Sequence, residues 1–213
     1  MDKESKVIII GNSPKVLENE YGSIIDSHDV VIRINKCVIE DYEKYIGSKI
    51  DIWATSHNYD EWYGYDFIPK RFENLSHIWK RTPSTQLNSL PKYLKSIPHL
   101  QMFKSNFYRS QINKNVRNYI NEAKLIAEPC TGLLTILTAT TFYKNISIYG
   151  FNFYKNHLNT TKSPHYYRSE DDTKEDKIWE SEKEKKFMSE NQINKKFKIV
   201  QNLVDKNLIK ILE

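Results

Sequence analysis

Long apolar runs, cysteine and glycine are all scarce in this chain of 213 residues. No stretch approaches the roughly 18 to 20 apolar residues that cross a bilayer, and the run at 7–10 is too short for a signal peptide. The two cysteines, Cys37 and Cys130, form no metal-binding pattern and are typical of a reducing compartment. With six glycines there is no Gly-rich linker, and we expect one cytoplasmic domain spanning 1–213.

The charge and hydrophobic content exclude two further classes of protein. Hydrophobic residues make up 39% and aromatic residues 13% of the chain, which excludes a disordered protein. The net charge of +5 is mild, and the basic residues are spread along the whole length. A nucleic-acid interface would cluster them, so we expect no nucleic-acid partner and favour a small anionic ligand.

The order of apolar segments predicts an α/β fold. Strands are expected at 6–10, 30–34, 50–54, 76–80, 146–149 and 197–200, and helices at 131–143 and 176–191. Such alternation favours a single Rossmann-like domain, with a mostly parallel sheet flanked by helices. The segment 81–121 is polar and broken by prolines, so we expect short helices and loops there, forming a small lid.

Polar residues follow several of the expected strands, where open parallel sheets bind their ligands. Three of these positions lie after strands, and a fourth opens the helix at 131–143, whose N–H groups suit an anion. The candidate residues are Gly11, Asn12, Ser13, Asn35, Thr131, Gly132, Asn152 and Tyr154. Structural roles compete with binding: residues 11–13 suit a turn and helix cap, Thr131 an N-cap, and Tyr154 a packed aromatic.

The order of these segments resembles a known family. Residues 7–58, with GNS at 11–13, IDSHD at 25–29, VIRIN at 31–35 and GSK at 47–49, resemble the long sialylmotif of glycosyltransferase family 29. Residues 129–151 resemble its short sialylmotif, and His-Tyr-Tyr at 165–167 is similar to the motif that follows. The segment 150–154 also looks like its counterpart in bacterial family 42 sialyltransferases.

The resemblance implies a sialyltransferase-type variant of the GT-A fold that binds CMP-sialic acid and inverts the anomeric carbon without a metal or other cofactor. By motif, Asn12 and Asn35 would contact the phosphate and ribose, Thr131 and Gly132 the ribose or phosphate, and Asn152 the ribose. Tyr154 would donate its hydroxyl to the departing phosphate.

The resemblance leaves the general base open. Family 29 proteins carry a further histidine after His-Tyr-Tyr, and here its place falls on Lys177. Three explanations compete. His165 acts as the base, although the family assigns that histidine chiefly to phosphate contact. A carboxylate within 170–172 serves instead. Or the chain binds its nucleotide with little or no turnover.

Two departures from the families and one pair of acidic residues bear on the chemistry. The family's disulfide positions fall on or near Val7 and Tyr143, so that bridge cannot form. Glu128 stands where family 42 places a basic residue, which leaves a CMP-activated ulosonic acid other than sialic acid, such as Kdo, open as the donor. Asp171 and Asp172 match a paired-Asp metal motif, but their charged loop favours a solvated run, and we expect no metal.

We therefore expect a CMP-sugar-dependent glycosyltransferase acting on a glycan or glycolipid acceptor, as in polysaccharide or lipooligosaccharide biosynthesis, with peripheral membrane contact left open. A nucleotide-binding protein without transferase activity is the alternative. A metal-dependent transferase using a UDP- or GDP-sugar is a third reading.

Overall fold

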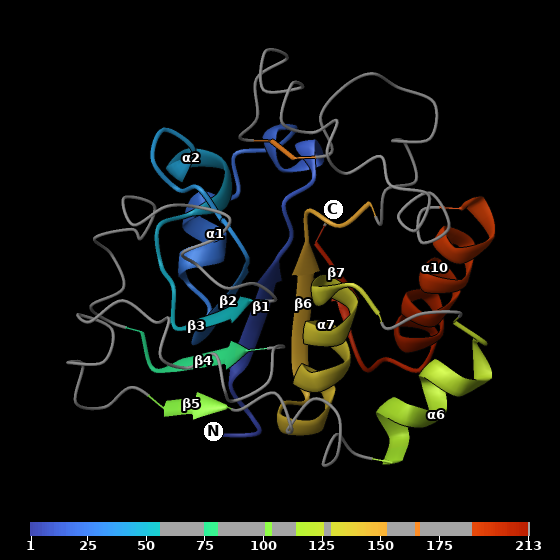
Figure 1. The fold of residues 1–213 in the computed structure, drawn as a ribbon. Helices are drawn as coiled ribbons and strands as arrows, with labels where there is room; N and C mark the ends of the chain where they lie inside the picture. Colours follow the sequence, from blue (N-terminus) through green and yellow to red (C-terminus); the bar gives the residue numbers. More distant parts are fainter. Residues whose placement is uncertain are drawn as a thin grey trace.

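The computed structural model describes residues 1–55, 75–80, 101–103, 114–125, 129–152, 165–166 and 189–212. These segments build one parallel sheet with helices on both faces (Figure 1). Within them, no helix is both long and apolar enough to cross a bilayer.

The sheet has seven strands in the order β5-β4-β3-β2-β1-β6-β7, and every pair is parallel. The strands are β1 Lys6–Ile10, β2 Val30–Ile34, β3 Ile52–Thr55, β4 His77–Lys80, β5 Gln101–Phe103, β6 Asn145–Tyr149 and β7 Lys210–Ile211. From β1 the chain builds outward through β2 to β5, and then returns to place β6 on the other side of β1.

The helices form two layers, one on each face of the sheet (Figure 1). One layer holds the 3₁₀ helix η1 Pro14–Leu17, α1 Gly22–Asp26 and α2 Glu43–Ile46. The other holds α6 Lys114–Glu122, α7 Thr131–Phe142 and α10 Glu190–Asp205.

Successive residues of β1 enter two separate hydrophobic cores. Val7 and Ile9 pack with α7 and α10, whereas Ile8 and Ile10 pack with η1, α1 and α2. Both sets are buried, because a parallel strand between two helical layers has no face left for water. This explains the uninterrupted apolar run, and burial of each such side chain contributes about 1.5–3 kcal/mol.

Most of the expected elements are present, within two residues at each end. The exception is 197–200, which was expected to be a strand and lies inside α10. Its apolar residues extend a helical spacing, since Ile193, Val200 and Leu203 are all buried on one face. Of the helix expected at 176–191, residues 176–188 lie outside the described residues.

Two short strands were not expected. β5 lies within the segment predicted to be helices and loops, and it extends the sheet beyond β4. α6 agrees with the helices expected in that same segment. β7 pairs with β6 through only two residues, too few to show a strand pattern in the sequence.

Candidate active site at the carboxyl edge of the sheet

The strand order reverses between β1 and β6, and such a switch point is where open α/β sheets bind ligands. Gly11 and Gly150 follow these two strands directly. The N–H of Gly11 donates to the carbonyl of Tyr149 (2.8 Å), and the N–H of Ser13 donates to that of Gly150 (3.0 Å). The first and third of the sequence-predicted strand ends therefore lie side by side.

Close packing accounts for both glycines. A β-carbon added at Gly11 would lie 2.3 Å from the carbonyl oxygen of Gly150 and 3.1 Å from the ring of Phe151. Gly150 has a φ of +72°, and a β-carbon there would lie 2.3 Å from Val16. The sequence suggested that Gly11 admits a ligand, but the space it leaves is filled by the backbone after β6.

Asn12 links this region to the end of β2. Its Nδ2 donates to the carbonyl oxygen of Ile34 (3.0 Å), which orients the amide. Its Oδ1 therefore points away from that carbonyl, where an acceptor suits a hydroxyl such as that of a ribose.

Asn35 follows β2 in the left-handed conformation, with a φ of 52°. Its N–H donates to the carbonyl of Ala54 (2.8 Å), and its own carbonyl accepts from Nε1 of Trp53 (2.8 Å). The backbone is thus held on both sides. Asn is one of the few residues other than glycine that adopt this conformation routinely.

The N-terminus of α7 reaches the same place. A β-carbon added at Gly132 would lie 2.9 Å from the ring of Phe151 and 3.8 Å from Ile34. Thr131 is the first helical residue and not the N-cap, which is Cys130. The first N–H bonded within the helix is that of Leu134, to the carbonyl of Cys130 (3.0 Å). The preceding N–H groups therefore lie at the positive end of a 12-residue helix.

His165 is brought to this edge by its neighbour. The N–H of Tyr166 donates to the carbonyl of Asn12 (3.1 Å), so the His-Tyr pair lies beside the end of β1. His165 is half-buried and Tyr166 is buried. The sequence predicts a role for His165 alone. The presence of Tyr166 in the same His-Tyr-Tyr motif was the signal that could have drawn attention to it.

The remaining predicted residues fall in three groups. Ser13 caps η1, its Oγ accepting from the N–H of Lys15 (3.3 Å), so the capping interpretation holds for its side chain. Asn152 follows Phe151 and is half-buried. Tyr154, Lys177 and the acidic run 170–172 lie outside the described residues. Among the residues that the structure does describe, no three His, Cys, Asp or Glu side chains gather in a metal-binding group.

Charged residues of the long motif serve the scaffold. The guanidinium of Arg33 is fully buried, donating through Nε to the carbonyl of Lys49 and through Nη2 to that of Ile46 (both 2.8 Å). Asp26 accepts from the N–H groups of Ser48 and Lys49 at 2.8–2.9 Å. Both side chains thus hold the turn after α2 and do not reach the site.

The two cysteines differ in environment. Cys37 is buried, and burial raises the pKa of its thiol to about 12, with Arg33 opposing and Glu40 adding to that shift. Cys130 is half-buried at the start of α7. Both are free thiols.

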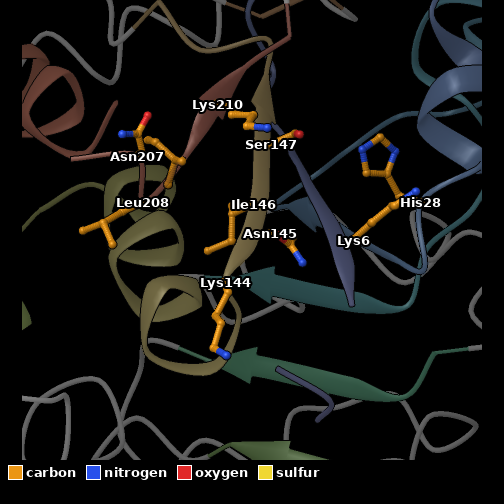
Figure 2. Close-up of a pocket in the computed structure, with 10 residues that line it drawn as sticks. Lys6, His28, Lys144, Asn145, Ile146, Ser147, Asn207, Leu208 and Lys210 are labelled. Atoms are coloured by element: carbon orange, nitrogen blue, oxygen red, sulfur yellow. The ribbon is translucent and has the colours of Figure 1, made fainter. Parts of the chain in front are cut away.

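A hollow of about 490 Å³ lies at the opposite, amino-terminal edge of the sheet. Its lining residues flank β6, with Lys6 and His28 to one side and Asn207 and Leu208 to the other (Figure 2). None of the sequence-predicted site residues lines it. Its cations are surface side chains, and Lys144 is paired with Glu4. The convergence of predicted residues favours the carboxyl edge as the site.

Comparisons with known proteins bear on the family and the fold of this chain. The sequence model of glycosyltransferase family 29 (sialyltransferase) matches residues 2–198. A Gallus gallus CMP-N-acetylneuraminate-beta-galactosamide-alpha-2,3-sialyltransferase 1 is 29% identical over 154 residues, covering 67% of this chain and 43% of that protein. An Arabidopsis thaliana β-1,6-galactosyltransferase is 46% identical over 50 residues, 24% of this chain and 13% of that protein. The chain thus spans less than half the length of either relative.

Solved structures share the fold. The Campylobacter jejuni sialyltransferase CstII, in complex with the substrate analogue CMP-3FNeuAc, has a TM-score of 0.61 at 19% identity, covering 97% of this chain and 80% of that one. A mammalian sialyltransferase in complex with Gal-beta-1-3GalNAc-ortho-nitrophenol has a TM-score of 0.59 at 17% identity, covering 98% and 69%.

Proposed function

The chain belongs to glycosyltransferase family 29, the sialyltransferases, and from that premise we propose that it transfers sialic acid or a related ulosonic acid from a CMP-sugar to a glycan hydroxyl. The observation that carries the proposal is the contact network at the carboxyl edge, where Gly11, Asn12 and Gly132 meet the ends of β2 and β6. The C. jejuni neighbour, bound to CMP-3FNeuAc, supports the choice of donor.

The reaction breaks the bond between the anomeric carbon and the CMP phosphate oxygen, and forms one to the acceptor oxygen. Negative charge builds on the departing phosphate. The N-terminus of α7, with the N–H groups of Thr131 and Gly132, would stabilise that charge, and Tyr154 would donate its hydroxyl to it. Neither group needs a metal, so we propose a metal-independent reaction, which activity unchanged by EDTA would support.

The acceptor hydroxyl must lose its proton as it attacks, and we assign that proton to His165. General bases typically contribute 10² to 10⁴-fold to a rate. The main-chain link between Tyr166 and Asn12 supports the assignment, because it holds the histidine beside the strand end that would bind the nucleotide. Attack from the face opposite the phosphate inverts the anomeric carbon.

Binding of the nucleotide uses the other predicted residues. Asn12 and Asn35 would contact the ribose and phosphate, and Asn152 the ribose. The parts of 81–121 that lie outside β5 and α6 would act as a lid that shapes the acceptor site. Two free thiols suit a reducing compartment, so we place the activity in the cytoplasm.

Calorimetric titration with CMP tests the binding half of this proposal. We expect saturable binding of one CMP per chain, weaker binding of UMP and AMP, and a higher melting temperature with CMP. No heat signal and no thermal shift at millimolar CMP would refute it.

The lysine at position 177 favours a second candidate, a nucleotide-binding protein without transfer. Binding of CMP with no turnover of any CMP-sugar would support that candidate. Because one relative is named a galactosyltransferase, UDP-galactose belongs among the donors tested.

A further inference from the structure

Tyr166 makes contact with two separate loops at the carboxyl edge of the sheet. Its N–H donates to the carbonyl of Asn12, in the loop after β1. Its hydroxyl donates to the carbonyl of Val38, in the loop after β2. Its ring packs edge-on against that of Tyr42, with the centroids 4.9 Å apart.

These contacts determine both the position and the orientation of the tyrosine. Tyr166 is 7% exposed and belongs to the same core as Ile8, Ile10 and Val16. One anchor acts on the main chain and one on the end of the side chain, so the residue can neither shift along β1 nor swing its hydroxyl end away from Val38 without losing a bond. Consecutive Cα atoms lie about 3.8 Å apart, so the main chain of His165 is held with it.

We propose that Tyr166 is a positioning residue, which sets where the His165 imidazole stands over the nucleotide site. The proposal rests on the function proposed above, in which His165 takes the acceptor proton. The hydroxyl bond to Val38 has a specific part in it: it ties the histidine to the loop that follows Asn35, so that base and nucleotide site keep one geometry.

Positioning of this kind acts on the chemical step. A displacement of about 1 Å in a catalytic group can cost on the order of 100-fold in rate. Loss of one hydrogen bond at the anchor loosens the histidine without removing it. We therefore expect the turnover rate to fall while binding of the donor changes little.

Tyr166→Phe tests the proposal, and Tyr149→Phe is its matched control. Tyr149 belongs to the same core, is 5% exposed, and donates its hydroxyl to the carbonyl of Val16 (3.1 Å). Each variant keeps the aromatic ring and removes one buried hydroxyl bonded to a main-chain carbonyl. Their losses of stability should be comparable, so a difference between them reports on the histidine.

The first readout is the NMR signal of His165 in the full chain labelled with ¹³C-histidine, identified among the six histidines by its loss in His165→Ala. We expect it to shift and broaden in Tyr166→Phe and to stay unchanged in Tyr149→Phe. The second is CMP release from CMP-sialic acid, where Tyr166→Phe should lower kcat at least about fivefold and change KM less than about twofold.

An unchanged His165 signal in Tyr166→Phe would overturn the proposal, as would equal changes of that signal in both variants. A wild-type chain that releases no CMP would refute the proposed function instead, and the NMR comparison would still decide whether Tyr166 positions the histidine.

Discussion

The carboxylate of Asp26 binds the N–H of Ser48 with both oxygens, at 2.9 and 2.8 Å, and its Oδ2 also accepts from the Ser48 hydroxyl (3.0 Å). The two residues lie 22 positions apart, in two pieces of the long motif. Gly47 makes the approach possible: its φ is +68°, and a β-carbon there would lie 2.2 Å from Asp26 Oδ1.

Asp26→Ala should therefore destabilise the fold without changing the nucleotide site. Loss of a charged acceptor from several hydrogen bonds should lower the free energy of unfolding by about 2–3 kcal/mol. Urea denaturation measures this, and CMP affinity of the folded protein should stay within about twofold.

Glu20→Ala is the control for Asp26, because Glu20 is an exposed acid and its ion pair with Lys44 (3.1 Å) is screened by solvent, so its removal should change stability little. Similar losses from the two variants, or a large fall in CMP affinity with Asp26→Ala, would contradict the scaffold role.

Two substitutions of Asn35 separate the effect of its backbone conformation on stability from the effect of its side-chain amide on CMP binding. Asn35→Gly keeps the left-handed backbone and removes the amide, whereas Asn35→Ala also adds about 1–2 kcal/mol of backbone strain. Both should weaken CMP binding by about three- to tenfold, as expected for one lost hydrogen bond. Only Asn35→Ala should show the added loss of stability. A glycine variant with wild-type affinity would show that the amide does not bind the nucleotide.

Cys130 reports on the N-terminus of α7. N-ethylmaleimide should modify one thiol per folded chain, at half-buried Cys130, because Cys37 is only 3% exposed. CMP should slow that reaction, since its phosphate would occupy the adjacent helix terminus, and UMP should slow it less. The Cys37→Ala variant should behave identically. Modification of Cys130 at the same rate with saturating CMP would place the nucleotide elsewhere.

Alkaline pH should weaken the fold through Cys37. Burial raises the pKa of its thiol to about 12 in the folded protein, above the ordinary value of 9.0 expected in the unfolded chain. Above that lower value the unfolded state binds fewer protons, so the free energy of unfolding falls by about 1.4 kcal/mol per pH unit. Below it the contribution is constant.

The Cys37→Ala variant isolates this contribution. Burial, and to a smaller extent the charge of Asp51, also raises the pKa of Tyr143 to about 12. Because Tyr143 is present in both proteins, its contribution cancels in the stability difference between them. The stability difference between wild type and variant should stay level to about pH 9 and then change steadily. A level difference up to about pH 10.5 would contradict the burial of the thiol.

The sheet could be predicted wherever its strands are long and buried on both faces. β1 contains an uninterrupted apolar run because two helical layers leave it no polar face, and β2 and β6 are mostly apolar for the same reason. β7 could not be predicted, since its two residues are exposed and depend on pairing with β6. The strand predicted at 197–200 was wrong, because a run of four apolar and polar residues does not distinguish a strand from one turn of a helix such as α10.

Which residues gather at the candidate site could be predicted better than what each of them contacts there. Strand ends converge by topology, so Gly11, Asn35 and Asn152 could be placed at one edge. What Gly11 packs against could not be predicted, because Gly150 is distant in sequence. The same holds for Arg33, whose charge suggests a ligand but whose guanidinium is bonded to carbonyls after α2.

CMP release from CMP-sialic acid, compared between the wild type and His165→Ala, tests the central claim most directly. Hydrolysis needs no known acceptor, so it reports on the donor site and the base alone. The wild type should release CMP, and His165→Ala should release it at least about 100-fold more slowly while still binding CMP. Two results would contradict the proposed function. One is a wild-type chain that binds CMP but does not hydrolyse CMP-sialic acid. The other is a His165→Ala variant that hydrolyses CMP-sialic acid as fast as the wild type.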